Sequence, residues 1–159
     1  MSVMIEKKDV LNIAVKIEEN GERFYREAAK RSKSEEVKRL FEFLANDEVK
    51  HKETFSKMVM DFNVNDSEMT EEYQNYLKAY SDRLVFDDSG NEAVNKMKEL
   101  DQVWAIDFAI QRELDSVLYY YELKNIVAKS EHPLIDRIID EERSHFTKLS
   151  KIKSILING

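Results

Sequence analysis

The sequence predicts an all-α protein organised as a bundle of four long helices. Only 3 Gly and 1 Pro occur among its 159 residues, and a sheet or a turn-rich fold needs more of these turn-forming residues. Charged residues make up 36% and apolar residues 42% of the chain, a mixture typical of long amphipathic helices. Apolar residues recur at alternating spacings of three and four in four segments. The length fits one domain spanning residues 1–159.

The boundaries of the four helices follow from residues that start helices. Asp9 is a candidate N-cap for the first helix, and Ser34, followed by two glutamates, caps the second. Pro133 suits the first position of the last helix. The predicted helices span about 9–31, 34–61, 101–129 and 133–157.

The connections between these helices determine the expected topology. Very short turns join the first helix to the second and the third to the fourth, so each pair forms an antiparallel hairpin. Residues 61–100 form a long crossover, with one short helix expected over about 71–80. A crossover of this length lets the second and third long helices run parallel, as in ferritin-like folds.

Charge and cysteine content exclude several functions. The net charge is −7 and no basic cluster stands out, which argues against nucleic-acid binding. The chain has no cysteine, so disulfides, iron–sulfur clusters, iron held by four cysteines and thiol catalysis are excluded. Residues 1–8 lack the apolar core of a signal peptide, and no segment has membrane-spanning length, so we expect a soluble cytoplasmic protein without a membrane partner.

Six polar residues interrupt the apolar stripes of the four helices. Two of the stripes carry a Glu-x-x-His pair, and each of the other two carries one glutamate. The i, i+3 spacing puts both members of a pair on one helix face. The six residues are Glu18, Glu48, His51, Glu113, Glu142 and His145.

Four inward carboxylates need compensating charge. Burying one unpaired carboxylate costs several kcal/mol, and four carboxylates close together repel one another. No Lys or Arg lies on the stripes, whereas two divalent ions would balance four negative charges. A shell rich in carboxylates favours two iron ions, with manganese or zinc as alternatives. A single Glu-x-x-His usually lies on a solvated face, but two that both interrupt apolar stripes predict a metal site.

The two halves of the chain resemble each other. The segment 14–25 matches 109–120, and both segments carry a tyrosine seven residues after the inward glutamate, Tyr25 and Tyr120. These tyrosines either donate hydroxyls to ligand carboxylates across the bundle or serve as core aromatics. Five acidic neighbours fall off the stripes and are expected to face solvent: Glu19, Asp47, Glu53, Asp140 and Glu141.

At these residues the chain resembles the rubrerythrin branch of the ferritin-like di-iron carboxylate proteins. The resemblance covers nearly the whole chain and implies that Glu48 and Glu142 bridge two irons. It also implies that Glu18 and Glu113 are terminal ligands, with one histidine on each iron, and that the reaction is peroxide reduction. The chain departs from the family in lacking a cysteine-bearing rubredoxin domain. It also has Ser116 where rubrerythrins carry an additional glutamate.

Three hypotheses follow from the sequence. The first is an oxidoreductase, peroxidase-like or ferroxidase-like, that acts on hydrogen peroxide or oxygen. Its electrons would come from an external donor such as a rubredoxin-type protein. The second is a ferritin-like protein that binds, oxidises and stores iron without peroxidase turnover. The third is a bundle whose ligands are vestigial or hold a structural metal. We expect a homo-oligomer, with a dimer favoured.

Overall fold

A computed structural model describes residues 4–86 and 89–159 and confirms the all-α fold class. Four long helices form the bundle: α1 (Lys7–Arg31), α2 (Glu35–Asp61), α5 (Gln102–Leu123) and α6 (His132–Asn158). Two further helices lie in the crossover, α3 (Glu71–Phe86) and α4 (Ser89–Lys96), and a 3-10 turn, η1 (Lys129–Glu131), precedes α6. The described residues contain no strand, only an isolated antiparallel bridge between Val64 and Val127.

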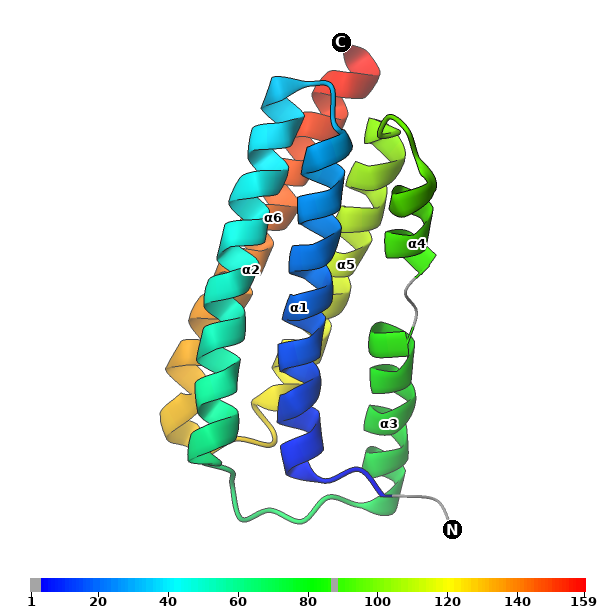
Figure 1. Ribbon diagram of the computed structural model, residues 1–159. Helices are drawn as coiled ribbons and strands as arrows, with labels where there is room; N and C mark the ends of the chain where they lie inside the picture. The colour runs from blue at the N-terminus through cyan, green and yellow to red at the C-terminus, as the bar shows by residue number, and fades with distance from the viewer. Residues whose placement is uncertain (1–3, 87–88) are drawn as a thin grey trace.

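The bundle has the one-crossover topology (Figure 1). Helices α1 and α2 form one antiparallel hairpin and α5 and α6 form the other, and the closest packing lies within each hairpin. The crossover runs back along the bundle, so that α2 and α5 point the same way. Helices α3 and α4 lie end to end beside α1 and α5 (Figure 1), and they cover that side of the bundle.

The observed helix starts follow local capping chemistry. The Ser34 hydroxyl accepts from Val37 N at 3.3 Å, and the Asp101 carboxylate accepts from Trp104 N at 3.1 Å. The first helix starts earlier than predicted, at Lys7, and Asp9 is not its N-cap. Asp9 instead lies in the first turn, where its carboxylate accepts from Glu6 N at 2.9 Å as half of a capping box.

The crossover contains more helix than the single short segment predicted. Helix α3 continues to Phe86 rather than ending near residue 80, because Leu77 and Leu84 extend its apolar face onto the lower core. The second helix, α4, was not predicted; it packs Val94 into the upper core. Residues 1–3 and 87–88, which fall within the predicted domain and crossover, lie outside the described residues.

Helix α5 ends at Leu123, not near residue 129. The chain then turns, and Asn65 N donates to Ile126 O at 2.9 Å while Ala128 N donates to Asn63 O at 3.0 Å. The start of the crossover therefore pairs with the Ile126 carbonyl and the Ala128 N–H, which a longer helix α5 would use for its own hydrogen bonds. Ile126 and Val127 are buried in this turn. In the sequence these two apolar residues look like a continuation of the apolar stripe of the helix, which is why the helix was predicted to be longer.

The apolar core forms two clusters separated along the bundle axis. The lower cluster includes Leu11, Phe55 and Ile138, and the upper cluster includes Phe41 and Ile106. The six polar residues predicted to point inward belong to neither cluster.

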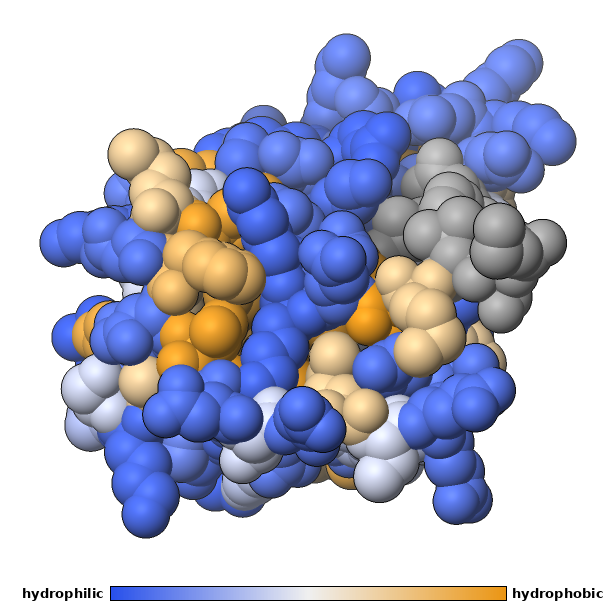
Figure 2. Space-filling view, turned by 90° about the horizontal axis from the view of Figure 1, so that it is seen from below, coloured by the Kyte–Doolittle hydropathy of each residue, from blue (hydrophilic) through white to orange (hydrophobic). Residues whose placement is uncertain are grey.

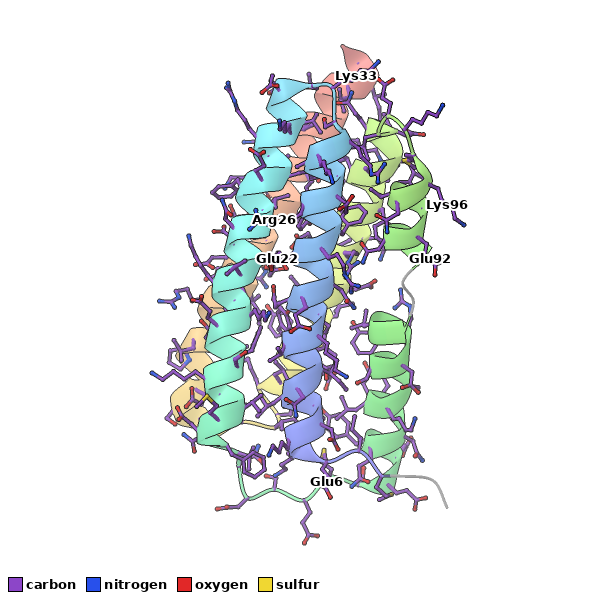
Figure 3. All side chains as sticks on the ribbon, viewed as in Figure 1. Glu6, Glu22, Arg26, Lys33, Glu92 and Lys96 are labelled. Atoms are coloured by element: carbon purple, nitrogen blue, oxygen red, sulfur yellow. The ribbon has the colours of Figure 1, made fainter. Side chains whose placement is uncertain are left out.

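Charged side chains cover the outside of the bundle. Glu22, Arg26 and Lys96 point outward (Figure 3), and an ion pair of 3.8 Å joins the first two. The end of the bundle where the crossover begins is largely hydrophilic, with apolar side chains visible between charged ones (Figure 2). Among the described residues, no helix is long and apolar enough to cross a membrane.

Candidate metal centre

Six side chains from the four bundle helices meet between the two apolar clusters. α1 contributes one, α5 contributes one, and α2 and α6 each contribute a Glu-x-x-His pair. All six are at most 4% exposed. The structure thus brings together every residue that the sequence predicts as a metal ligand: Glu18, Glu48, His51, Glu113, Glu142 and His145.

Their donor atoms form two overlapping groups of four, in each of which the ligand atoms lie within 4.8 Å of one another. One group contains Glu18 and His51, and the other contains Glu113 and His145. Both groups include Glu48 and Glu142. Two carboxylates shared between two four-residue groups is the arrangement expected for two bridged metal ions.

Each of the six residues also has one buried atom without a hydrogen-bond partner within the described part of the chain. These atoms are Glu18 Oε2, Glu48 Oε1, His51 Nδ1, Glu113 Oε2, Glu142 Oε1 and His145 Nδ1. Buried polar atoms normally have a hydrogen-bond partner, so six atoms that lack one and converge on one point require a ligand. In the described chain no Lys or Arg makes an ion pair with the four carboxylates; their only ion-pair contacts are with the two histidines. Two divalent cations fit both the charge and the donor set.

Without metal, bound protons neutralise part of the negative charge of the four carboxylates. Burial and the neighbouring Glu18 carboxylate raise the pKa of Glu48, and burial and Glu113 raise that of Glu142. Burial lowers the pKa of His51, but contacts with the Glu18 and Glu141 carboxylates outweigh it and raise the value to about 9. Metal ions must displace these protons, so binding strengthens as pH rises.

Two tyrosines contact the outer oxygens of the terminal carboxylates. Tyr25 in α1 donates its hydroxyl to Glu113 Oε1 in α5 at 2.5 Å. Tyr120 in α5 donates to Glu18 Oε1 in α1. Both tyrosines are at most 2% exposed. Each bond crosses from one hairpin to the other, and each fixes a carboxylate whose second oxygen faces the centre.

Two further carboxylates contact the outer nitrogens of the histidines, although the positions of both off the apolar stripes predict that they face solvent. Glu141 Oε2 lies 2.5 Å from His51 Nε2, and Asp47 Oδ2 lies 3.0 Å from His145 Nε2. The Asp47 side chain is only 15% exposed, against 44% for Glu141. A carboxylate behind a histidine fixes its ring and leaves Nδ1 free to bind metal. A signal was present, because an acidic residue precedes the glutamate of both Glu-x-x-His pairs.

The other acidic neighbours face outward, as expected. Glu19, Glu53 and Asp140 are exposed. Glu19 forms a surface ion pair of 3.3 Å with Lys52.

Small residues lie one turn after the central glutamates of α1 and α5. Gly21 lies one turn after Glu18, and a Cβ at this position would be 2.7 Å from Glu48 Oε2. Ser116 occupies the equivalent position after Glu113, is 8% exposed, and lines a cavity of about 120 Å³ together with Ile17 and Arg112. This cavity suits molecules of the size of water or peroxide rather than a large organic substrate.

Gly21→Ala is expected to weaken metal binding about tenfold, because the new methyl group displaces the Glu48 carboxylate from its position. Competition with a chromophoric chelator measures the affinity. Ser116→Ala is the matched control at the equivalent position of the other half, since it adds no atom. Equal affinity of Gly21→Ala and the unsubstituted protein would contradict the tight contact.

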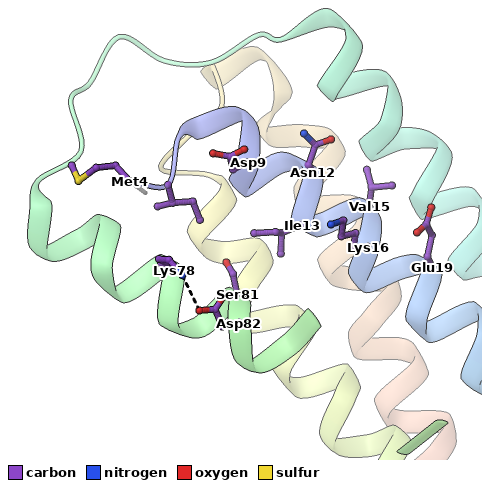
Figure 4. A pocket seen from close by; sticks show the side chains of 11 residues that line it. Met4, Asp9, Asn12, Ile13, Val15, Lys16, Glu19, Lys78, Ser81 and Asp82 are labelled. Carbon is purple, nitrogen blue, oxygen red and sulfur yellow. Dashed lines mark hydrogen bonds and ion pairs between the residues drawn. The ribbon is translucent and has the colours of Figure 1, made fainter. Parts of the chain in front are cut away.

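A larger pocket lies elsewhere. It has a volume of about 640 Å³ and lies between the N-terminal half of α1 and α3 (Figure 4). Ile13 and Ser81 line it, with the Lys78–Asp82 ion pair at its edge. None of the six central residues reaches this pocket.

Comparison with known proteins agrees with this geometry. The sequence model of the rubrerythrin family matches residues 9–153. A crystal structure from Thermotoga maritima, provisionally described as a ferritin-like diiron-carboxylate protein, is 32% identical in sequence and superimposes with a TM-score of 0.71. The match covers 96% of this chain and 97% of that one. No curated protein matches the sequence.

Proposed function

This chain belongs to the rubrerythrin family, and on that premise we propose that it is a non-haem di-iron oxidoreductase that reduces hydrogen peroxide or oxygen with electrons from an external donor. The observation that carries the proposal is the convergence, between two apolar clusters, of six buried donor atoms that have no hydrogen-bond partner in the described chain. We assign Glu48 and Glu142 as bridging ligands. Glu18 with His51 would complete one metal position, and Glu113 with His145 the other.

The protein residues orient the metal ligands and exclude bulk water from the centre. Two iron ions, when bound, supply two electrons to one oxidant. Tyr25 and Tyr120 hold the terminal carboxylates, and Asp47 and Glu141 hold the imidazoles. The two apolar clusters exclude bulk water above and below, which strengthens electrostatic interactions within the centre. A small oxidant would enter from the cavity that Ser116 lines, one helical turn after Glu113.

Metal analysis and optical spectroscopy test the proposal. The iron-loaded protein is expected to contain two irons per chain and to show an oxo-bridged di-iron absorption after oxidation. Peroxide should oxidise the reduced protein faster than it oxidises free iron. Glu142→Ala should lose the absorption, whereas Asp140→Ala, an exposed neighbour of equal charge, should keep it.

The outcomes separate this proposal from iron storage and from a vestigial site. Iron bound far above two per chain in a many-subunit assembly would favour storage. A protein that binds no iron would favour the vestigial bundle. Oxidation no faster than that of free iron would rule out peroxide reduction.

A further inference from the structure

Helix α5 carries a row of apolar side chains that face solvent. Their exposed fractions are 37% for Val103, 40% for Leu114, 59% for Leu118 and 41% for Tyr121. Their spacing along the sequence puts all four on one face of the helix. We call these four residues the α5 patch. Single exposed leucines are common on folded proteins, so the patch must be compared with an equivalent surface.

The repeat within the chain provides that comparison, because positions 109–120 of α5 have counterparts in α1. The counterparts of Leu114 and Leu118 are Glu19 and Arg23, which are also exposed. No large apolar side chain of α1, which is described over its whole length, is as exposed as those of the α5 patch. The same outer face is therefore charged in one hairpin and apolar in the other, and a continuous apolar surface of this kind marks a site of association.

One end of the patch has residue types that often dominate binding at interfaces. Arg143 of α6 lies over the Tyr121 ring, 5.7 Å from its centroid, and donates a hydrogen bond to the Tyr121 hydroxyl. Tyrosine and arginine are enriched among the residues that contribute most to protein–protein binding. The stacked pair extends the surface of the patch from α5 onto α6.

Three ion pairs border the patch, and each is neutral as a pair. They are Asp107–Lys153, Lys124–Asp136 and Arg143–Asp140, with N–O distances of 2.5, 2.7 and 3.4 Å. The chain carries a net charge of −7, so two copies repel each other over much of their surfaces. At the patch the neighbouring charges are already paired, so a second copy can approach without this repulsion. A partner of opposite charge would be recognised by unpaired acidic side chains instead.

We propose that the α5 patch is the interface of a homodimer, in which two copies pack through their α5–α6 hairpins about a twofold axis. The axis passes near Leu118, the most exposed member of the patch, and sets the two α5 helices antiparallel. The sequence alone favours a dimer but does not locate its interface. The proposal does not depend on the proposed oxidoreductase function.

The face formed by α5 and α6 is large enough for such a dimer. The distance from Val103 to Tyr121 is about 27 Å along the helix, and two helices side by side are about 20 Å wide. The resulting footprint of about 500 Å² per copy amounts to about 1,000 Å² for the pair, which reaches the size of a specific interface.

Sedimentation velocity tests the proposal, and the unsubstituted chain is expected to be a dimer at micromolar concentration. Leu114→Glu combined with Leu118→Arg gives α5 the residues that α1 has at the counterpart positions, which the same kind of helix already tolerates. This variant should raise the dimer dissociation constant by about a hundredfold, as loss of central interface residues does. Glu19→Arg combined with Arg23→Glu is the matched control on α1 and should remain a dimer. Circular dichroism should show equal helix content in all three proteins.

Cross-linking locates the interface without disrupting it. Because the chain has no cysteine, Leu118→Cys adds a single thiol at the proposed axis. A short bis-maleimide should join two such chains about tenfold faster than two Arg23→Cys chains at equal concentration, because the dimer raises the local concentration of the first thiol only. A monomeric unsubstituted chain, a Leu114→Glu and Leu118→Arg variant that dimerises normally, or equal cross-linking rates would each overturn the proposal.

Discussion

Loading with two equivalents of ferrous iron is expected to raise the melting temperature by about 10 °C. The metal-free centre buries four carboxylates that repel one another, and metal binding to the native state alone replaces that repulsion with attraction. Free metal at about a thousandfold excess over its Kd contributes about 4 kcal/mol, and each kcal/mol shifts the melting temperature of a domain of this size by about 2–4 °C. Anaerobic calorimetry with and without iron measures the shift.

Glu142→Gln provides the control, because it removes one charge from the shared position and keeps the volume. Its metal-free form should melt at or above the temperature of the unsubstituted metal-free protein, and iron should add little. A substitution that stabilises the empty protein and abolishes the gain from metal distinguishes a binding site from a structural cluster. Identical melting of the iron-loaded and metal-free unsubstituted protein would show that the ligands are vestigial.

The same measurement has a definite pH dependence. The pKa values of Glu48, Glu142 and His51 are raised in the native state, so these three groups bind more protons in the native protein than in the unfolded protein above about pH 4.5. The metal-free protein therefore loses stability from these groups as pH rises through the raised values. Metal binding requires their deprotonated forms, so the stabilisation by iron should grow over the same range.

Asp47→Ala is expected to weaken one of the two metal positions by about 10- to 100-fold, as loss of a carboxylate behind a metal-binding histidine typically does. The substitution removes the acceptor for His145 Nε2, so the ring loses both its orientation and part of its basicity. The position that contains His51 should keep its affinity. A competition titration should therefore change from two similar steps to two separated ones.

Glu141→Ala tests the equivalent contact on the other histidine. A smaller effect is expected, because Glu141 is 44% exposed and water has access to replace it. Asp140→Ala removes the same charge from the neighbouring position, where the side chain is 74% exposed, and should leave both steps unchanged. Equal titrations for Asp47→Ala and Asp140→Ala would mean that the contact to His145 does not support metal binding.

The central residues could be predicted from sequence because each is a polar residue in an apolar stripe. Glu18 and Glu142 lie at positions that the helix period places in the core. A buried carboxylate without a neighbouring Lys or Arg is costly, so it indicates a metal ligand. The helix period places a side chain on its own helix. It carries no information about the rotation and stagger of a neighbouring helix, which alone bring Asp47 to His145 and Glu141 to His51.

The crossover was the least predictable part of the fold for a related reason. The end of α5 depends on the hydrogen bond that Asn65 N donates to Ile126 O, and these two residues are remote in sequence. Helix α3 extends beyond its predicted end because Leu77 and Leu84 pack on the lower cluster, and a local pattern does not show that surface. Local signals therefore located the starts of the four long helices and the ends of α1, α2 and α6, whereas the ends of α3 and α5 depend on contacts that are remote in sequence.

The four hydrogen bonds around the centre all join one hairpin to the other, and none lies within a hairpin. Each half alone holds three of the six donor residues and none of the partners that orient them. A hairpin made first during synthesis therefore has no competent site, and metal capture must wait until both halves have docked in the correct register. With the metal centre proposed above, metal uptake would report that folding is complete, and a partly assembled chain would be kept from holding reactive metal.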